Sequence, residues 1–458
     1  MFYFVLLKQS KVPLYFSRSL HHTHCMQLYD RLYASSFSHK ISHPFVHIMF
    51  GARQTGKSTL IRSIIPPESL VFDFSNPSQR LQFAANPGRF IDMYRALPSS
   101  ESPRFIFLDE VQSVPELFDA VQFLYDEEKR SAPDERRTRF ILCGSSARRL
   151  RRTGTNLLPG RSILHHLYPL TSIEYQPFIP PGFPVETLYG SRSLVPIFKD
   201  EPRLVSPFPK RTLEDRMIYG ELPAMAIPYA ERGTNADPRR ELLRSYVAAY
   251  IEEELHRETQ IREWGPFLRF LSLAAYESGG IMNFAGIAKE SGLSAPTVKA
   301  HYQLLEDMFL GFMVPAFSGS SRKTALSTPR FFFIDLGLRN AAAGLSLTPD
   351  TLLANPGPLF EQWVGIELYK RLSYLGDSQL SYFRTAGGAE VDFIIEQSGI
   401  LYPIEVKWTE NPTTKDARHL ESFLQDHRDR TSHGYIVCRA PYPLAVSNTV
   451  TAIPWWLL

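Results

Sequence analysis

The sequence predicts an α/β protein whose main sheet is parallel and carries helices on both faces. Between residues 45 and 178, short apolar runs alternate with stretches of helical length. This alternation is typical of strands that are buried on both faces and joined by crossover helices. A second pair of apolar runs, at residues 390–395 and 402–406, flanks a short glycine-containing turn. That pair predicts a hairpin in a second α/β unit near the end of the sequence.

The first apolar run, residues 45–50, is followed by a phosphate loop that satisfies the pattern G-x-x-x-x-G-K-[ST]. Its glycines allow backbone N–H groups to turn toward a phosphate, and the helix behind the loop directs its positive end at the anion. Lys57 is expected to reach the β- and γ-phosphates, and Ser58 to hold Mg²⁺. The residues predicted to bind the nucleotide are Gly51, Ala52, Arg53, Gln54, Thr55, Gly56, Lys57, Ser58 and Thr59.

Two further runs, at residues 69–73 and 104–108, predict the next strands, and the second of them ends in Asp109 and Glu110. Ligands bind beyond the carboxyl ends of strands in open α/β sheets. Asp109 is therefore expected to hold the magnesium ion, directly or through water. Glu110 is expected to polarise the attacking water as a general base. The alternative, a strand that merely ends in acids at the surface, is disfavoured by the phosphate loop upstream.

The fourth predicted strand, residues 139–143, is followed by Gly144, Ser145 and Ser146. A small polar residue at this place can contact the γ-phosphate and position water, so Ser145 is the preferred candidate and Ser146 the second. An ordinary strand-to-helix turn with a serine cap explains either serine alone equally well.

The composition, 44% hydrophobic and 21% charged, is that of a globular protein, and 458 residues predict about two to four domains. The net charge of +3 indicates no overall acidic or basic partner. Three widely spaced cysteines fit a reducing, cytoplasmic compartment without a disulfide framework. No apolar run approaches the roughly 20 residues that span a bilayer, so no membrane partner is expected.

Changes in pattern along the chain predict five segments. A dispensable N-terminal extension (1–44) precedes the nucleotide-binding core (45–178), and a proline-rich lid or linker (179–237) follows it. A helical region (238–330) and a C-terminal α/β domain (331–458) complete the chain.

The helical region begins with a long amphipathic helix at residues 241–258 and contains a helix-turn-helix pattern at residues 284–299. The turn is expected at Ser291 and Gly292, and Ser294 caps the second helix. This second helix offers only Lys299 and His301 as basic groups, whereas a DNA reader needs several phosphate contacts. A structural packing module is favoured over direct DNA reading.

A second group of charged residues lies on the C-terminal hairpin. Glu405 and Lys407 share one face of a strand because they are two residues apart, and Asp392 on the neighbouring strand can meet them. Two carboxylates beside a lysine can bind Mg²⁺ and align water against a phosphodiester, with Asp392 and Glu405 as the metal ligands. The alternative is a surface salt bridge. A further acid is expected from the helix at 359–368, where six residues turn the helix by about 240°. Glu361 is preferred there, with Glu367 in reserve.

These motifs together resemble a prokaryotic family of AAA+-type ATPases whose C-terminal half is a domain of unknown function similar to PD-(D/E)XK nucleases. The resemblance covers residues 45–425 and implies ATP binding, ATP hydrolysis, a winged-helix-like middle and a restriction-endonuclease-like end. The sequence departs from the family at the proline-rich stretch 176–210 and at the N-terminal extension. The matching segments are residues 51–59, 107–112, 144–146, 168–170, 360–361, 390–393 and 404–407.

AAA+-type enzymes are expected to complete the ATP site with an arginine from a neighbouring subunit, which makes a homo-oligomer one expected assembly. Arg161 is preferred because it follows Gly160, as in family members. The run of arginines at 148–152 supplies the other candidates, and it alternatively contacts nucleic-acid phosphate or forms a solvated helix face.

The main hypothesis is a Mg²⁺-dependent ATPase that couples its nucleotide state to a nuclease-like domain acting on DNA or another nucleic acid. Its catalytic candidates are Lys57, Asp109, Glu110, Ser145 and Arg161 in the ATP site, and Glu361, Asp392, Glu405 and Lys407 in the second site. The alternative is a nucleotide-dependent regulatory switch with an inactive nuclease fold that binds a partner.

Overall fold

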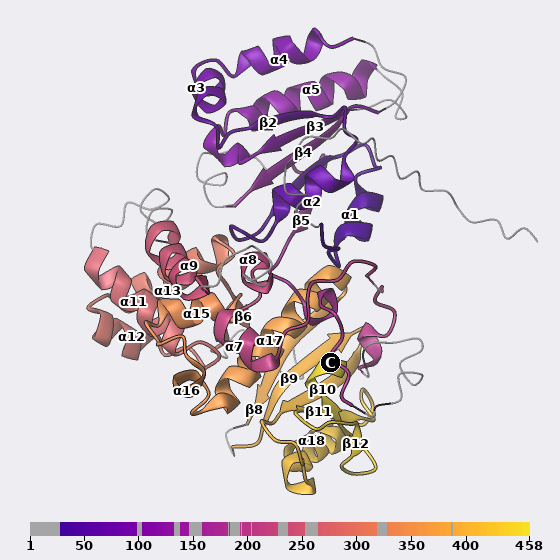
Figure 1. Ribbon diagram of the computed structural model, residues 1–458, viewed down its shortest axis with the longest axis vertical. Helices are drawn as coiled ribbons and strands as arrows, with labels where there is room; N and C mark the ends of the chain where they lie inside the picture. Colours follow the sequence, from indigo (N-terminus) through magenta and orange to yellow (C-terminus); the bar gives the residue numbers. More distant parts are fainter. Residues whose placement is uncertain are drawn as a thin grey trace, which may run out of the picture.

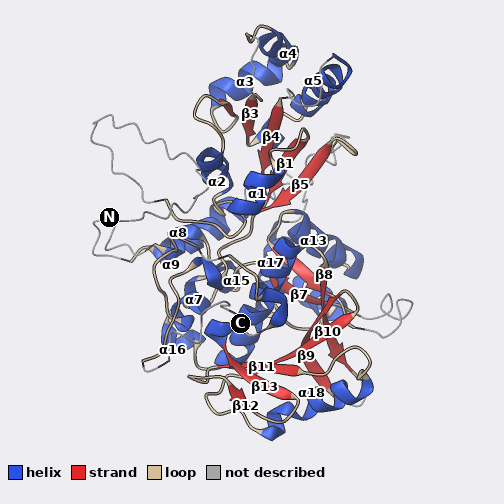
Figure 2. Cartoon of the chain, turned by 90° about the vertical axis from the view of Figure 1, so that its right-hand side faces the viewer, coloured by secondary structure: helices blue, strands red, loops and turns tan. Residues whose placement is uncertain are grey.

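The computed structural model describes residues 28–98, 103–131, 138–145, 158–181, 183, 193, 195–202, 204–227, 237–251, 264–317, 328–385 and 388–458. Figure 1 shows a parallel sheet at one end of the long axis and a second, mixed sheet at the other end. Figure 2 shows the same two sheets from the side, with helices of the middle region beside and between them. The protein is an α/β protein, as the sequence predicts.

The first sheet has five strands in the order β2-β3-β4-β1-β5, and every neighbouring pair is parallel. The four strands that the sequence predicts are confirmed, each to within one residue at either end. The fifth strand was not predicted, because its run Ser-Ile-Leu-His-His is short and half polar. The strands are β1 (Val46–Phe50), β2 (Leu70–Asp73), β3 (Phe105–Asp109), β4 (Arg139–Gly144) and β5 (Ser162–His166).

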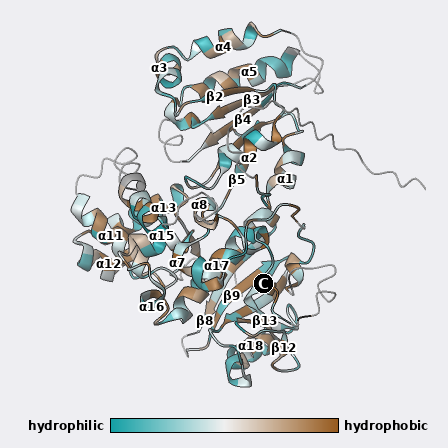
Figure 3. Cartoon of the chain, viewed as in Figure 1, coloured by the Kyte–Doolittle hydropathy of each residue, from teal (hydrophilic) through white to brown (hydrophobic). Residues whose placement is uncertain are grey.

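Helices cover both faces of this sheet, and the period of two along each strand separates the two cores. Ile48 and Leu142 face one set of helices, which contributes Phe118 to their shared core. Met49 and Ile141 face the other set. Figure 3 shows the apolar strands between helices whose outer faces are hydrophilic. The first set is α3 (Pro77–Ala85), α4 (Gly88–Arg95) and α5 (Leu117–Ser131), and the second is α1 (Ala34–Lys40) and α2 (Lys57–Ile64).

Short elements lie between β3 and α5 and after β5. The long helix predicted at residues 241–258 instead appears as α9, which continues as one π-helical stretch, η7; residues 252–263 lie outside the described residues. The elements are η1 (Val111–Ser113), η3 (Ser172–Glu174), η5 (Pro196–Phe198), α7 (Leu213–Tyr219), α8 (Pro223–Ala226), α9 (Arg239–Ser245) and η7 (Tyr246–Ile251).

The two helices of the predicted helix-turn-helix are present as α12 and α13. Gly292 ends the first in the left-handed region at φ 78°, and the side chain of Ser294 accepts a hydrogen bond from the backbone of Thr297 to cap the second. A short antiparallel ladder, β6 with β7, follows them. The elements are α11 (Trp264–Tyr276), α12 (Phe284–Ser291), α13 (Ala295–Asp307), β6 (Gly311–Val314), β7 (Arg330–Phe333), α15 (Leu336–Ala342) and α16 (Pro349–Leu352).

The C-terminal sheet has six strands in the order β12-β13-β11-β10-β9-β8 and mixes parallel and antiparallel pairs. The predicted hairpin is β9 with β10, and its turn passes through Ser398 and Gly399, both at positive φ. Hydrophobic residues from this sheet and from the middle region, among them Phe267, Phe332 and Phe393, form one core. The elements are α17 (Pro356–Leu375), β8 (Ser378–Arg384), β9 (Glu390–Gln397), β10 (Ile400–Val406), α18 (Thr414–Asp426), β11 (Gly434–Cys438), β12 (Leu444–Ala445), β13 (Val450–Pro454) and η8 (Trp455–Leu457).

Among the residues that the structure describes, no helix has both the length and the apolar character needed to cross a membrane.

Candidate functional site

The phosphate loop connects the end of β1 to the first turn of α2, and two glycines determine its course. Gly51 has φ 152°, and a Cβ atom there would lie 2.2 Å from the carbonyl oxygen of Leu167. Gly56 has φ 91° and forms the N-terminal cap of α2. Larger residues would clash at the first position and would be strained at both. The loop therefore brings its backbone around the N-terminus of α2, where free N–H groups and the helix dipole favour an anion.

Lys57 and Ser58 occupy the first turn of α2. The Lys57 ammonium donates hydrogen bonds to the carbonyl oxygens of Gly51 and Ala52, each at 2.8 Å, so its charge lies inside the loop. The Ser58 hydroxyl donates to Asp109 Oδ1 at 2.9 Å. Burial raises the pKa of Asp109, and the Ser58 hydrogen bond opposes this shift. The structure thus brings the hydroxyl and the carboxylate predicted to hold Mg²⁺ into contact.

Gln112 joins the other two predicted groups of this site. Its amide nitrogen donates both to a carboxylate oxygen of Glu110 and to the Ser145 hydroxyl, which lies 3.1 Å away. Gln112 is buried, and a Cβ atom on Gly144 would meet its amide oxygen at 2.7 Å. Glu110 itself has φ 54°, a left-handed conformation at the end of β3. Gln112 belongs to the motif that carries the family resemblance, but its sequence position alone gives no sign of this bridging role.

A pocket that is open to solvent lies over the loop. Three cationic side chains and one carboxylate line it, which suits a polyanion. Its donors and hydroxyls fit a nucleoside triphosphate with Mg²⁺, because the loop, Lys57 and the Ser58–Asp109 pair supply the groups that each requires. The lining residues are Arg53, Gln54, Gly56, Lys57, Ser58, Thr59, Ser75, Arg80, Glu110 and Ser113. Sequence reasoning did not identify Ser75, Arg80 and Ser113.

The predicted arginine, Arg161, is not part of this lining. Its Nε donates to Asp126 Oδ1 on α5 at 2.7 Å, and about a third of its side chain is exposed. Its action on a neighbouring copy of the chain stays a prediction. The arginine run at 148–152 and Ser146 lie outside the described residues.

The second site lies where α17 meets the β9–β10 hairpin. Asp392 Oδ2 accepts a hydrogen bond of 2.8 Å from the backbone N–H of Val406, and Glu405 Oε1 accepts one of 2.6 Å from the Lys407 ammonium. Glu361 on α17 is close enough to interact electrostatically with both carboxylates. The two strands and the helix thus bring together the four residues that the sequence singled out.

Burial and mutual repulsion alter the acidity of these carboxylates. Burial and then the charge of Asp392 raise the pKa of Glu361 to about 7 and that of Glu405 to about 8. Burial also raises the pKa of Asp392. Like charges that crowd together in a buried place favour protonation, so this site carries fewer negative charges at neutral pH than its composition implies.

Arg330, at the start of β7, provides a counter-charge that the sequence analysis did not foresee. Its guanidinium donates to Glu361 at 2.7 Å and also to Glu390. Arg330 is buried and lies over the ring of Tyr382. The only local sign in the sequence is a single arginine directly before the apolar run 331–333, and its partners lie far away along the chain.

The carboxylate site partly fits a magnesium ion. Glu405 Oε2 is buried and accepts no hydrogen bond from the part of the chain that the structure describes, so it is available to a cation. Within those same residues, however, no three His, Cys, Asp or Glu side chains are grouped to hold a metal. Asp392 and Glu405 therefore suit an ion that takes two carboxylates and several waters, as Mg²⁺ often does.

The reserve candidate, Glu367, lies elsewhere. It is buried, and its Oε1 accepts hydrogen bonds from the backbone and hydroxyl of Ser172, at 2.7 and 2.6 Å. The helical rotation predicts that only one of the two glutamates faces the hairpin, and the structure places Glu361 there and Glu367 beside Ser172.

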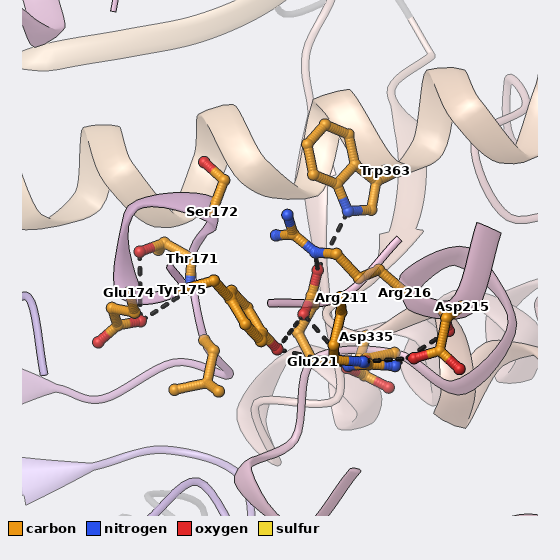
Figure 4. Close-up of polar contacts among 12 residues, drawn as sticks. Thr171, Ser172, Glu174, Tyr175, Arg211, Asp215, Arg216, Glu221, Asp335 and Trp363 are labelled. Atoms are coloured by element: carbon orange, nitrogen blue, oxygen red, sulfur yellow. Dashed lines mark hydrogen bonds and ion pairs between the residues drawn. The ribbon is translucent and has the colours of Figure 1, made fainter. Parts of the chain in front are cut away.

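A buried polar cluster centred on Glu221 joins the end of the nucleotide unit to α7, α15 and α17 (Figure 4). The Glu221 carboxylate accepts from the Tyr175 hydroxyl at 2.5 Å, from Arg216 at 2.6 Å and from the Trp363 indole at 3.1 Å. Its backbone N–H donates to Asp335, the cap of α15. Sequence reasoning read the segment around Glu221 only as a turn.

Comparison with known protein families agrees with this arrangement. Residues 43–176 match the AAA domain, and residues 356–458 match a domain of unknown function (DUF4143). Residues 210–348 match another domain of unknown function (DUF8612). The chain therefore combines an AAA-type ATPase domain with a C-terminal DUF4143 domain.

Among curated proteins, this chain is similar to two mycobacterial proteins, both described as uncharacterized. They are Rv2008c of Mycobacterium tuberculosis and Mb2031c of Mycobacterium bovis, each 24% identical over 433 residues, which is 94% of this chain and 84% of the relative.

Among solved structures, the Aeropyrum pernix ORC1 protein in complex with DNA matches 68% of this chain and 91% of its own, at 12% identity and a TM-score of 0.24. The Vibrio cholerae protein VC1899 matches 86% and 88%, at 12% identity and a TM-score of 0.15. These two likenesses are too weak to support an argument about fold or function.

Proposed function

We propose that this AAA-type protein binds ATP with Mg²⁺ over the phosphate loop, hydrolyses it, and uses its nucleotide state to control the C-terminal carboxylate site. One observation carries the first part of the proposal: Ser58 and Asp109, from the loop and from β3, are in hydrogen-bond contact beside the Lys57 ammonium. These are the groups that a magnesium–triphosphate requires, in one place.

In this proposal, each residue has a defined task. Lys57 exchanges the carbonyl oxygens of Gly51 and Ala52 for phosphate oxygens, and Ser58 and Asp109 hold the metal. Magnesium, when bound, neutralises charge on the β- and γ-phosphates. Glu110 accepts the proton of the attacking water, and Gln112 keeps Glu110 beside Ser145, which orients that water.

Replacement of Glu110 by glutamine tests the hydrolysis step. A glutamine keeps the shape of the side chain but cannot accept the proton, so steady phosphate release should fall by about 100-fold or more while ATP still binds. Glu116→Gln, which alters an exposed glutamate directly before α5, is the matched control and should release phosphate at the unaltered rate. Equal rates for the unaltered protein and Glu110→Gln would refute the assignment. The same assay with and without DNA tests whether nucleic acid affects turnover.

For the C-terminal site we propose that Asp392, Glu405, Lys407 and Glu361 act on a phosphodiester, with DNA or another nucleic acid as substrate. Asp392 and Glu405 would hold Mg²⁺, and Lys407 would stabilise the negative charge that develops on the phosphate. The test is Mg²⁺-dependent cutting of plasmid and branched DNA. Cutting should disappear in Asp392→Ala and persist in Asp377→Ala, an exposed aspartate next to α17. Equal cutting by both variants would remove the nuclease assignment.

A second function is favoured by one specific observation: the Arg330 guanidinium already pairs with Glu361 and Glu390. A protein cation in this place reduces the need for a metal, as in a nuclease fold that binds a partner without cutting. In this version the protein is a nucleotide-dependent switch with slow or no turnover. A purified preparation that binds ATP, releases no phosphate and cuts no DNA would support the switch and exclude the enzyme.

The helix-turn-helix is proposed as a packing module rather than a DNA reader. The His301 ring lies against Phe267 and Phe270, at 5.0 and 5.1 Å between ring centres, so one of its two basic groups is used inside the protein. Lys299→Ala should therefore leave DNA association unchanged. A clear loss of DNA affinity in that variant would favour DNA reading.

A further inference from the structure

Arg31, which lies just before α1 in the segment that the sequence analysis treats as a dispensable extension, contacts the phosphate loop. Its side chain is buried. Its Nη1 donates a hydrogen bond of 2.6 Å to the carbonyl oxygen of Thr55, the residue between the variable part of the loop and Gly56. The same nitrogen lies 3.3 Å from the position that a Cβ atom on Gly56 would take. The guanidinium therefore fills the space directly behind the loop.

This contact fixes the direction of a peptide group that faces the phosphate site. In a planar trans peptide, the carbonyl group of Thr55 and the N–H group of Gly56 point in opposite directions. When Arg31 holds the carbonyl oxygen, the N–H of Gly56 is directed away from Arg31. Gly56 lines the pocket over the loop, and inward-pointing N–H groups are what a phosphate loop offers to its anion.

Arg31 is itself held by two further contacts. Its Nε donates to Glu174 Oε1 at 2.7 Å, and its Nη2 donates to the carbonyl oxygen of Tyr168 at 2.8 Å. Glu174 is fully buried, and it also accepts from the backbone N–H of Leu32 at 2.7 Å. The second Glu174 oxygen accepts from the backbone and hydroxyl of Thr171, a contact drawn in Figure 4.

The directions of these three hydrogen bonds favour arginine over lysine or methionine at position 31. The fork of an arginine can satisfy three acceptors in fixed directions, whereas a lysine ammonium is a point charge on a flexible stem. Only the guanidinium can bind Glu174, Tyr168 and Thr55 at once with little loss of side-chain freedom. A methionine would fill part of the volume but donate nothing.

We infer that Arg31 is a positioning residue for nucleotide binding, which orients the Thr55–Gly56 peptide so that the loop is ready for phosphate. This inference rests on the proposed ATP site. Arg31 then belongs to the nucleotide site, and the N-terminal segment that carries it is necessary for full ATP affinity.

The experiment compares Arg31→Met with Arg371→Met in the full-length protein. Arg371 is a matched control, because it is also buried and donates to a glutamate, Glu201, and to a carbonyl oxygen, that of Leu458. Both variants should lower the melting temperature. Only Arg31→Met should weaken ATP binding in the presence of MgCl₂, by about 10-fold, the change expected for one hydrogen bond from a charged donor. Arg31→Lys should fall between Arg31→Met and the unaltered protein.

Several outcomes overturn the inference. If Arg31→Met and Arg371→Met bind ATP with the same affinity, Arg31 is merely a structural residue. Lys57→Ala is measured in parallel: if it binds ATP as tightly as the unaltered chain, the proposed ATP site itself fails. Loss of binding in Lys57→Ala together with unchanged binding in Arg31→Met would sink only the present inference.

A second measurement covers the case in which Arg31→Met does not fold. Arg31→Lys without nucleotide should then exchange the backbone hydrogens of residues 51–58 faster than the unaltered protein, with no change in α5. Equal exchange at residues 51–58 in the two folded proteins would overturn the inference.

Discussion

The backbone N–H of Tyr168 donates a hydrogen bond of 3.0 Å to the hydroxyl of Tyr374, two residues that are far apart in the sequence. Tyr168 follows the last strand of the five-stranded sheet, and Tyr374 is in the last turn of α17. The ring of Tyr374 also stacks on that of Tyr33, with 5.0 Å between the ring centres. The Tyr374 side chain therefore joins α17 directly to the nucleotide unit.

Tyr374→Phe should lower the free energy of unfolding by about 1 kcal/mol, because the buried N–H of Tyr168 loses its acceptor. Denaturant unfolding followed by circular dichroism measures the change. Tyr276→Phe is the control, since that side chain is mostly exposed and should have no effect. A Tyr374→Phe protein as stable as the control would mean that water replaces the hydroxyl.

Gln112→Ala should lower the kcat of ATP hydrolysis by about 10-fold and leave KM nearly unchanged, since Gln112 positions Glu110 and Ser145 and does not line the pocket. Steady-state phosphate release over a range of ATP concentrations separates the two constants. An increase in KM with an unaltered kcat would instead indicate that Gln112 helps to bind ATP.

The raised pKa values of Glu361 and Glu405 predict a pH dependence of stability. Both carboxyl groups bind protons more tightly in the folded protein than at their ordinary pKa of 4.5, with folded values of about 7 and about 8. The stability that these two carboxyl groups contribute is fully present below their ordinary pKa. It is lost as the pH rises through their pKa values in the folded protein. The free energy of unfolding of the unaltered protein should therefore contain a component that falls between about pH 5 and pH 8.

The variant Glu405→Gln isolates this component, because its amide does not titrate. Its unfolding free energy, measured by denaturant titration at several pH values, should decline less steeply over that range than that of the unaltered protein. Parallel curves for the two proteins would show that Glu405 is ionised in the fold.

A pair of buried histidines predicts a separate loss of stability in acid. The His165 ring forms two hydrogen bonds between α1 and the sheet. Its Nδ1 lies 2.7 Å from the Tyr33 hydroxyl, and its Nε2 lies 3.0 Å from His47 Nδ1. Burial lowers the pKa of His47 to about 4 and that of His165 to about 3. Groups with a lowered folded pKa stabilise the fold above their ordinary value of 6.5, and this stability is lost as the pH falls below it.

The variant His165→Gln keeps polar atoms in this place but does not titrate. Between pH 7 and pH 5, the unaltered protein should lose about 2 kcal/mol more than this variant, because one histidine must remain neutral against its ordinary pKa. Denaturant unfolding at the two pH values gives the difference. An equal loss in both proteins would contradict a neutral His165.

The strands of the nucleotide unit could be predicted because each is a local apolar run, and Gly51 and Gly56 could be predicted because a phosphate loop requires them. Helical rotation predicts that Glu361 and Glu367 face different sides of one helix, but it does not decide which of them meets the hairpin.

Arg31, Arg330 and the Glu221 cluster could not be predicted from local sequence. Arg31 and Glu174 are 143 residues apart, and Trp363 and Glu221 are 142 residues apart. Neither residue of such a pair has a neighbour in the sequence that reveals its partner. Their contacts are decided by how the segments are placed in space, which a single sequence does not specify at this level of detail.

Helix α17 contacts both the nucleotide unit and the carboxylate site on the hairpin. Tyr374 near one end of this helix and Glu367 near its middle contact the nucleotide unit, whereas Glu361, closer to the other end, interacts with the carboxylates of the hairpin. The 13 helical steps from Glu361 to Tyr374 span about 20 Å at the rise of an α-helix, over which the backbone bends little. If Tyr374 shifts, we therefore expect the helix to move as one body and the distance between Glu361 and Asp392 to change.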